Sequence, residues 1–427
     1  MQKGPTKRDM YFPALDGIRA LAVLLVVFHH LGPFPAANDA AELLNRFTSW
    51  GWIGVDCFFV LSGFLITRLL LEEKAQIGNI SLPKFYLRRA ARIWPLYYLM
   101  LFLASVVVPF CSPHQPSFME WIGAVPRIIA PFMLFAGNFS IIFDWKSLYE
   151  FDKAISGIGA SMMCAMLMPL WSISIEEQFY LAWPWIVNKA KSLGILSKTS
   201  VAFAASSILA STAILWSLPT SSIELLHNFY YLNTACRIFP LMAGALLAIL
   251  HFANPPVFAN SGKQPLKLAS LSAVLFFLVL AYMPPIQKVS LLHIVTFAAT
   301  AGAFSLLIWL SLAWKPLTSV FSNKVLVYLG KRSYAIYLFH VPCMWLVRTG
   351  ICPLFHIQFL SATEWVVTAV VGIPLSILAS ELSWHLIEKP FIGLRQTLNP
   401  LNTEKGAKRA EHNTLSAQHS GIVGHGR

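Results

Sequence analysis

Ten predominantly apolar segments recur along the chain, and each is about long enough to cross a lipid bilayer as a helix. Only 12% of the 427 residues are charged, whereas soluble domains carry about 25% charged residues. The pattern therefore predicts an all-α, polytopic membrane protein with ten transmembrane helices. The segments lie near residues 18–34, 50–71, 93–110, 170–188, 200–217, 233–252, 268–283, 292–313, 334–350 and 364–387.

A further apolar segment, at 121–143, decides the topology of the chain. Cytoplasmic loops collect Lys and Arg. If this segment does not cross the membrane and the N-terminus is inside, 25 of the 32 Lys and Arg residues fall on the inner side. If it crosses, that bias is lost. We therefore expect 121–143 to lie at the outer face or to re-enter the membrane, with both termini cytoplasmic.

Residues 1–394 are expected to form a single membrane domain, followed at 395–427 by a disordered, basic cytoplasmic tail. The formal net charge of +13 is explained by this topology and does not indicate nucleic-acid binding. The first apolar segment is similar to a signal peptide, but no clean A-x-A cleavage pattern follows it. The six cysteines are scattered without a C-x-x-C pair, so neither a metal site nor a disulfide framework is predicted.

The first apolar segment carries charged groups that a bilayer penalises, in the sequence DGIRALAVLLVVFHH at 16–30. Ionisable residues within spans usually face the bundle interior or a water-filled cavity. Arg19 and His30 are eleven residues apart, which places them within about 20° on one helix face and about 16 Å apart along its axis. His29 points about 100° away from that face. The alternative is an arginine that anchors the inner end and a histidine at the outer interface.

Acidic residues in two other segments are candidate partners for a histidine. Asp56 lies near the start of the second segment, and Glu176 and Glu177 stand in tandem in WSISIEEQFYLAWP, where only one of them can face the interior. A carboxylate can hold a histidine tautomer and stabilise the imidazolium, so Asp56 and Glu177 are the candidates for His30. Asp56 could instead cap a helix end. The second segment also contains small residues that allow close helix approach: Gly54, Ser62 and Gly63.

Three arginines and a second histidine complete the set of ionisable residues. Arg88, Arg89 and Arg92 cluster where the third span begins. Guanidinium groups bind phosphate oxygens bidentately, although basic residues are also expected on the inner side. His340 lies inside the span at 334–350, as either a packing residue or a catalytic one.

Taken together, these motifs resemble those of the acyltransferase family 3 membrane proteins, which are O-acyltransferases with a ten-helix core. The match covers nearly all of 12–394, through LDGIRALAVLLVVFHH, GVDCFFVLSGFLI, FYLRRAARIWP, WSISIEEQFYLAWP, YAIYLFHVP and IEKPF in family order. The family's arginine and histidine, with ten residues between them, fall on Arg19 and His30. Its basic motif falls on Arg88, Arg89 and Arg92, and its glutamate motif falls on Glu176 and Glu177. Many members append a hydrolase-like domain, so this chain is similar to the stand-alone type.

The resemblance implies an inner-membrane enzyme that moves an acyl group, expected to be acetyl, from cytoplasmic acyl-CoA to a hydroxyl of a polysaccharide, glycolipid or other sugar-containing acceptor. No permanently bound cofactor is implied, and acetyl-CoA is the donor substrate. The residues expected to bind acyl-CoA are Arg19, Arg88, Arg89 and Arg92. The expected catalytic residues are His30, Asp56, Glu177, Glu176 and His340. His30 would act either as a general base or as a transient carrier of the acyl group.

Two other classes of membrane protein also bury charged residues. A secondary transporter or flippase is expected to show repeated halves with interrupted helices, and the sequence has no such repeat. A glycosyltransferase that uses a lipid-linked sugar is expected to carry an acidic pair in the first outer loop, where Asp39 and Glu42 form no D-x-D motif. Transfer of label from acetyl-CoA would separate an acyltransferase from both classes.

The predicted topology can be tested with the variant Ser147→Cys, made in a background that lacks the native cysteines. An impermeant thiol reagent is expected to label this cysteine from outside, because the preceding segment at 121–143 does not cross the membrane. Labelling only after the membrane is opened would mean that the segment crosses and that the chain has eleven spans.

Overall fold

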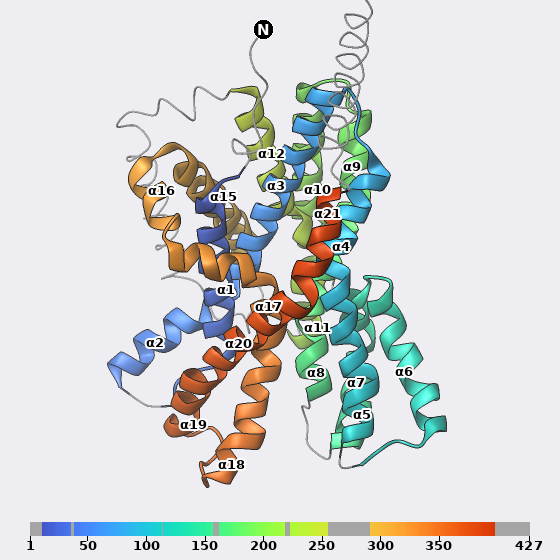
Figure 1. Ribbon diagram of the computed structural model, residues 1–427, viewed down its shortest axis with the longest axis vertical. Helices are drawn as coiled ribbons and strands as arrows, with labels where there is room; N and C mark the ends of the chain where they lie inside the picture. The colour runs from blue at the N-terminus through green and yellow to red at the C-terminus, as the bar shows by residue number, and fades with distance from the viewer. Residues whose placement is uncertain are drawn as a thin grey trace, which may run out of the picture.

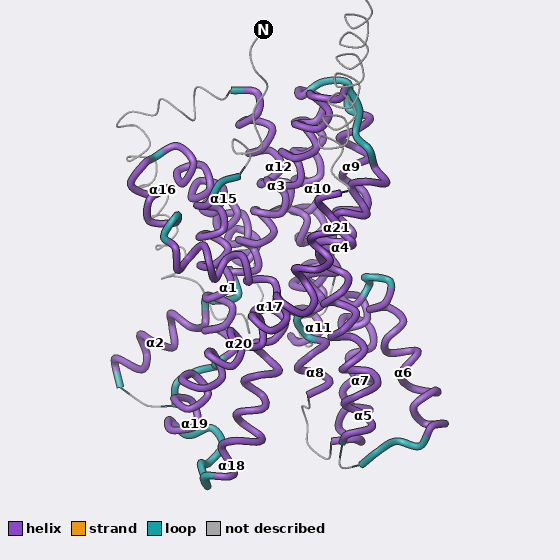
Figure 2. Tube along the Cα trace, in the orientation of Figure 1, coloured by secondary structure: helices purple, strands orange, loops and turns teal. Residues whose placement is uncertain are grey.

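The computed structural model describes residues 11–35, 38–112, 114–156, 162–217, 223–254 and 291–397, and every regular element within them is a helix (Figure 1). Figure 2 shows the same arrangement, with short loops joining long helices. The α-helices are α1 (Pro13–His30), α2 (Asp39–Ser49), α3 (Ile53–Ile77), α4 (Leu82–Phe102), α5 (Val108–Cys111), α6 (Phe118–Met133), α7 (Gly137–Ser156), α8 (Met162–Leu167), α9 (Leu170–Lys189), α10 (Leu193–Ser217), α11 (Ile223–Leu232), α12 (Thr234–Ala253), α15 (Leu291–Ala313), α16 (Lys315–Phe321), α17 (Lys324–Leu346), α18 (Cys352–Leu354), α19 (Ala362–Val367), α20 (Ile373–Ser383) and α21 (Lys389–Thr397). The π-helical turns are η1 (Leu103–Val107), η2 (Val347–Ile351), η3 (Thr368–Gly372) and η4 (Trp384–Glu388).

Within the described residues, eight helical stretches are long and apolar enough to cross a membrane, and each coincides with a predicted span. The predicted span at 170–188 is helix α9, which carries two glutamates. The predicted span at 268–283 lies outside the described residues. The all-α, multi-pass prediction is therefore confirmed. The count of ten spans and the cytoplasmic placement of the termini stay predictions.

The segment at 121–143 forms a hairpin rather than one continuous helix. Helix α6 ends at Met133, the chain turns at Phe135, which has a positive φ of 53°, and α7 begins at Gly137. Figure 1 shows both helices in the lower part of the bundle, with the turn between them near its middle. This shape agrees with the re-entrant interpretation of the segment.

Polar side chains from α4 and α9 satisfy the irregular backbone at the turn between α6 and α7. Three of them donate hydrogen bonds of 2.7 to 2.9 Å to its carbonyl groups: Tyr97, Tyr98 and Gln178. Non-helical backbone at membrane depth is tolerated only where protein or a water-filled cavity surrounds it. The three donors therefore explain how the hairpin can reach the middle of the bundle.

Helix α3 packs against α1, α9, α12 and α15, and its approach to α12 is close enough to exclude side chains. A Cβ atom added at Gly63 would lie 1.9 Å from the carbonyl oxygen of Leu241, and one added at Gly244 would lie 2.0 Å from that of Val60. Gly54 makes a similar approach to the backbone of α1. The close helix approach predicted for Gly54 and Gly63 is therefore confirmed.

The variant Gly244→Ala is expected to lower the melting temperature of the detergent-solubilised protein by several degrees, because the new methyl group would overlap the backbone of α3. Gly302→Ala is the matched control, since Gly302 is also helical but a Cβ atom there would have nothing within 4 Å. Thermal unfolding followed by intrinsic fluorescence measures both variants. Equal melting temperatures would contradict the close packing of α3 and α12.

Candidate active site

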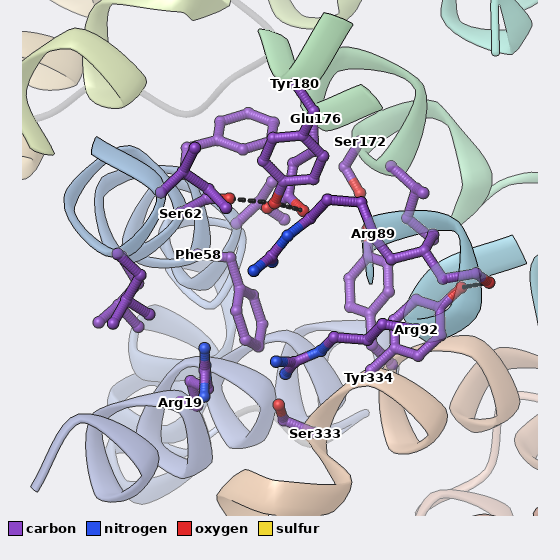
Figure 3. Close-up of a pocket in the computed structure, with 18 residues that line it drawn as sticks. Arg19, Phe58, Ser62, Arg89, Arg92, Ser172, Glu176, Tyr180, Ser333 and Tyr334 are labelled. Carbon is purple, nitrogen blue, oxygen red and sulfur yellow. Dashed lines mark hydrogen bonds between the residues drawn. The ribbon is translucent and has the colours of Figure 1, made fainter. Parts of the chain in front are cut away.

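A pocket lies between α1, α3, α4, α9 and α17, and it encloses about 830 Å³, including its open mouth. Figure 3 shows charged, hydroxyl and aromatic side chains pointing into it. We call it the arginine pocket. Its polar and charged lining residues are Arg19, Ser62, Arg89, Arg92, Ser172, Glu176, Tyr180, Ser333, Tyr334 and Tyr337.

Three guanidinium groups give the arginine pocket a net positive charge. They come from Arg19 on α1 and from Arg89 and Arg92 on α4 (Figure 3). Arg19 pairs with Asp16 at 2.7 Å. Over the described ranges, neither Arg89 nor Arg92 has a carboxylate partner, and Nε of Arg89 has no hydrogen-bond partner. Because Glu176 is the only acidic residue among the lining residues, the pocket is suited to an anionic ligand.

Arg88 does not belong to this group, although it was predicted with it. Its Nη2 atom lies 2.8 Å from Oε2 of Glu73 on α3, and each of the two side chains is only 5% exposed. The other carboxylate oxygen of Glu73 accepts a hydrogen bond from the amide of Ser81. A buried carboxylate is costly without a partner. The structure therefore places Arg88 outside the arginine pocket, where its guanidinium neutralises Glu73.

One wall of the arginine pocket carries a hydrogen-bonded chain that ends at Glu176. Tyr180 donates to Oε2 of Glu176 at 2.9 Å, and its hydroxyl also bonds Oγ of Ser62 (Figure 3). Tyr180 follows Glu176 by four residues, so helical spacing could have indicated the pair. A second hydroxyl pair, at 2.7 Å, lines the same pocket: Ser172 and Tyr337.

The tandem acids of α9 point to different surroundings. Glu176 faces the arginine pocket. Glu177 is not a lining residue, and its Oε2 atom accepts a hydrogen bond of 3.1 Å from Nε1 of Trp94 on α4. The structure thus answers which of the two acids faces the pocket, a choice that the sequence left open.

His30 and His340, predicted on separate spans, are brought together. Nε2 of His340 lies 3.2 Å from Nδ1 of His30, and the ring centroids are 4.8 Å apart. Each Nδ1 atom also contacts a backbone carbonyl oxygen, that of Val26 at 2.9 Å for His30 and that of Tyr337 at 2.7 Å for His340. We call these two residues the histidine pair.

These contacts determine the tautomers of the histidine pair. A carbonyl oxygen can only accept a hydrogen bond, so both rings carry their hydrogen on Nδ1. His30 shares that hydrogen between the Val26 carbonyl and Nε2 of His340, which leaves Nε2 of His30 as the basic nitrogen. His30 is exposed, whereas His340 is fully buried. The arrangement suits His30 to accept a proton from a substrate.

The histidine pair lies beside the arginine pocket rather than among its lining residues. Tyr337 connects the two, because it lines the pocket and its ring centroid lies 5.7 Å from that of His340. Helix α1 therefore contributes Arg19 to the arginine pocket and His30 to the adjoining histidine pair. His29 faces elsewhere, as the helical spacing predicts, with its Nδ1 atom 3.1 Å from the carbonyl oxygen of Thr48.

Asp56 has a partner that sequence analysis missed. Its Oδ1 atom lies 2.5 Å from Nη2 of Arg237, and the two side chains are 0% and 1% exposed. Arg237 lies four residues into the span predicted at 233–252, where a charge needs a partner. The position of Arg237 inside a predicted span was therefore the feature of the sequence that could have indicated a buried acidic partner. Aromatic rings surround the guanidinium, with centroids 4.2 to 6.0 Å from its central carbon: Phe59, Trp171, Tyr231 and Phe297.

The structure does not bring Asp56 or Glu177 against His30, as the sequence analysis expected. Asp56 neutralises Arg237, and Glu177 binds Trp94. His30 instead bonds a second imidazole, that of His340. A neutral ring can hold the neighbouring tautomer as a carboxylate does, but it adds no negative charge to stabilise an imidazolium.

Comparison with known proteins places the chain in a family. Residues 12–381 match the family profile described as Acyltransferase domain. The chain therefore belongs to this acyltransferase family, acyltransferase family 3. No solved structure matches the chain at a significant level.

Curated relatives are similar over most of this chain. Peptidoglycan O-acetyltransferase OatA of Listeria monocytogenes is 30% identical over 395 residues, which are 89% of this chain and 56% of that protein. YrhL of Bacillus subtilis, provisionally named a peptidoglycan O-acetyltransferase, is 31% identical over 400 residues, covering 90% of this chain and 55% of that protein. A Staphylococcus aureus protein provisionally named an O-acetyltransferase is 28% identical over 409 residues, covering 90% and 58%. The chain spans somewhat more than half the length of these relatives.

Proposed function

We propose that the protein is an inner-membrane O-acyltransferase that moves an acetyl group from cytoplasmic acetyl-CoA to a hydroxyl of a cell-envelope glycan. The arginine pocket carries the proposal, because three guanidinium groups and one carboxylate form a site for a polyanion inside a membrane domain. Family membership supports acyl transfer. The names of the Listeria monocytogenes and Bacillus subtilis relatives support a peptidoglycan-type acceptor.

In this proposal the arginine pocket binds the phosphates of acyl-CoA. Guanidinium groups bind phosphate oxygens with paired hydrogen bonds, and Arg89 and Arg92 have no carboxylate partner in the described part of the chain. The pantetheine arm would extend along α1 from Arg19 towards His30, over about 16 Å of helix axis. Glu176 faces the same pocket and holds Tyr180 beside the donor.

At the other end of α1, His30 is proposed to act on the acyl group. As a general base, its Nε2 atom takes the proton of the acceptor hydroxyl while that oxygen attacks the thioester carbon and the C–S bond breaks. As a nucleophile, the same atom takes the acyl group from the thioester and passes it to the acceptor oxygen. In the first route the protonated Nε2 atom passes this proton to the departing thiolate, and in the second route the proton of the acceptor hydroxyl goes to that thiolate. Both routes therefore yield an ester and free CoA thiol. His340 holds the required tautomer in either case.

Donor binding is tested with Arg89→Ala and Arg92→Ala. Each is expected to weaken acyl-CoA binding by about tenfold or more, because a hydrogen bond to a charged group contributes about 1.5–3 kcal/mol. The effect should shrink at high salt, where phosphate–arginine attraction is screened. Arg68→Ala is the control, since Arg68 on α3 pairs with Glu72 at 2.6 Å and does not line the pocket. Unchanged donor affinity in both pocket variants would leave these arginines as topology anchors.

The reaction is tested by incorporation of radiolabelled acetyl-CoA into glycan by membranes that contain the protein. His30→Ala is expected to abolish incorporation while the protein still inserts at normal levels. His29→Ala is expected to retain substantial activity, because Nδ1 of His29 contacts the carbonyl oxygen of Thr48, whereas Nδ1 of His30 contacts His340. The reverse result would contradict the assignment of His30. Transport of a glycan without any acylated product would identify a flippase instead.

A further inference from the structure

The two residues that follow His30 are each held by a side chain from another helix. Nη2 of Arg348 donates a 2.6 Å hydrogen bond to the carbonyl oxygen of Leu31, and Nε1 of Trp365 donates a 3.0 Å hydrogen bond to that of Gly32. Arg348 lies in η2 and Trp365 lies in α19. Figure 1 shows α19 in the lower part of the bundle. We call these two residues the α1 clamp.

Arg348 is itself held in one orientation. Its Nε atom lies 2.8 Å from Oε1 of Glu364, which is only 3% exposed and also accepts a hydrogen bond of 2.9 Å from Thr368. Charge-assisted hydrogen bonds are shorter and stronger than neutral ones. The guanidinium thus joins the end of α1 to a buried carboxylate on α19.

One side of this connection lies in a π-helical turn, and the other side lies in α19, directly before a second such turn. Arg348 belongs to η2, and Thr368 is the first residue of η3. A π-helical turn adds one residue to a helix and so shifts the register of the side chains beyond it. Such turns are rare and are found frequently at functional sites. The irregularity therefore falls where the two helices reach the residues after His30.

The end of α1 needs such support, because His30 is the last residue of the helix. Helix ends fray, and their final carbonyl groups lack partners within the helix. Gly32 has a positive φ of 74° and turns the chain away. A cation that binds carbonyl groups at a helix C-terminus is a favourable cap. Without it, the last turn could open, and Nδ1 of His30 would lose its contacts with Val26 and His340.

We propose that Arg348 is a positioning residue for acyl transfer, which holds the last turn of α1 so that Nε2 of His30 faces the acceptor. The inference rests on the proposed role of His30. Arg348 does not line the arginine pocket, so its removal should change turnover and not donor binding.

The experiment measures kcat and the KM for acetyl-CoA in clamp variants. Arg348→Ala is expected to lower kcat by about tenfold or more, because a small misplacement of a catalytic group is costly, and to change this KM by less than about twofold. Arg348→Lys should restore most of the rate, since an ammonium can still donate to Leu31. Trp365→Phe, which removes only the N–H donor, should have a smaller effect.

Arg127→Ala is the control, because Arg127 also pairs with an acid, Asp144 at 3.4 Å, but its side chain is 74% exposed.

Amide hydrogen exchange over residues 26–32 provides a second measurement that does not require acyl transfer. Faster exchange in Arg348→Ala, with unchanged exchange in Arg127→Ala, supports the clamp. Wild-type exchange in Arg348→Ala overturns it, as does an unchanged kcat or a loss of turnover shared by Arg127→Ala. Absence of transfer by the wild-type protein would overturn the proposed function instead, so the two failures can be told apart.

Discussion

A charge inside a bilayer is stable only where an opposite charge or a polar cavity meets it, and this constraint sorts the buried ionisable residues of the bundle into two groups. Arg88 and Glu73 neutralise each other, as do Arg237 and Asp56. These pairs are closed and support the helices around them. Arg89 and Arg92 have no such partner in the described structure and face a pocket. The residues left open by the pairing are therefore the ones available for a ligand.

Glycine contacts bring the helices close enough for the buried charged side chains to pair. Gly63 and Gly244 let α3 and α12 meet backbone to backbone, one helical turn or more from Asp56 and Arg237 on the same two helices. Helix α1 packs on both α3 and α17, so one of its faces reaches the arginine pocket through Arg19 and the histidine pair further along. The pocket and the histidine pair thus adjoin because three long helices share one core.

Much of this architecture could be predicted from the sequence, because hydrophobic length and helical period are local properties. The apolar segments indicated a multi-pass helical protein, and the order of the motifs indicated the acyltransferase family that the comparison confirms. The helical face of α1 was also predictable. The arginines of α4 were not, because an ideal helix places Arg92 about 40° from Arg88 and about 60° from Arg89. Periodicity could not choose between them.

The pairings between distant ionisable residues depended on the tertiary structure. The contact between His30 and His340 joins residues 310 positions apart, and that between Asp56 and Arg237 joins residues 181 positions apart. Such pairs depend on which face each helix turns inward, and that rotation is decided by packing against all its neighbours at once. The sequence by itself determined the membrane class, the family and the candidate residues. Only the folded bundle decided which charges cancel and which remain open, because partner choice is a property of the assembled core.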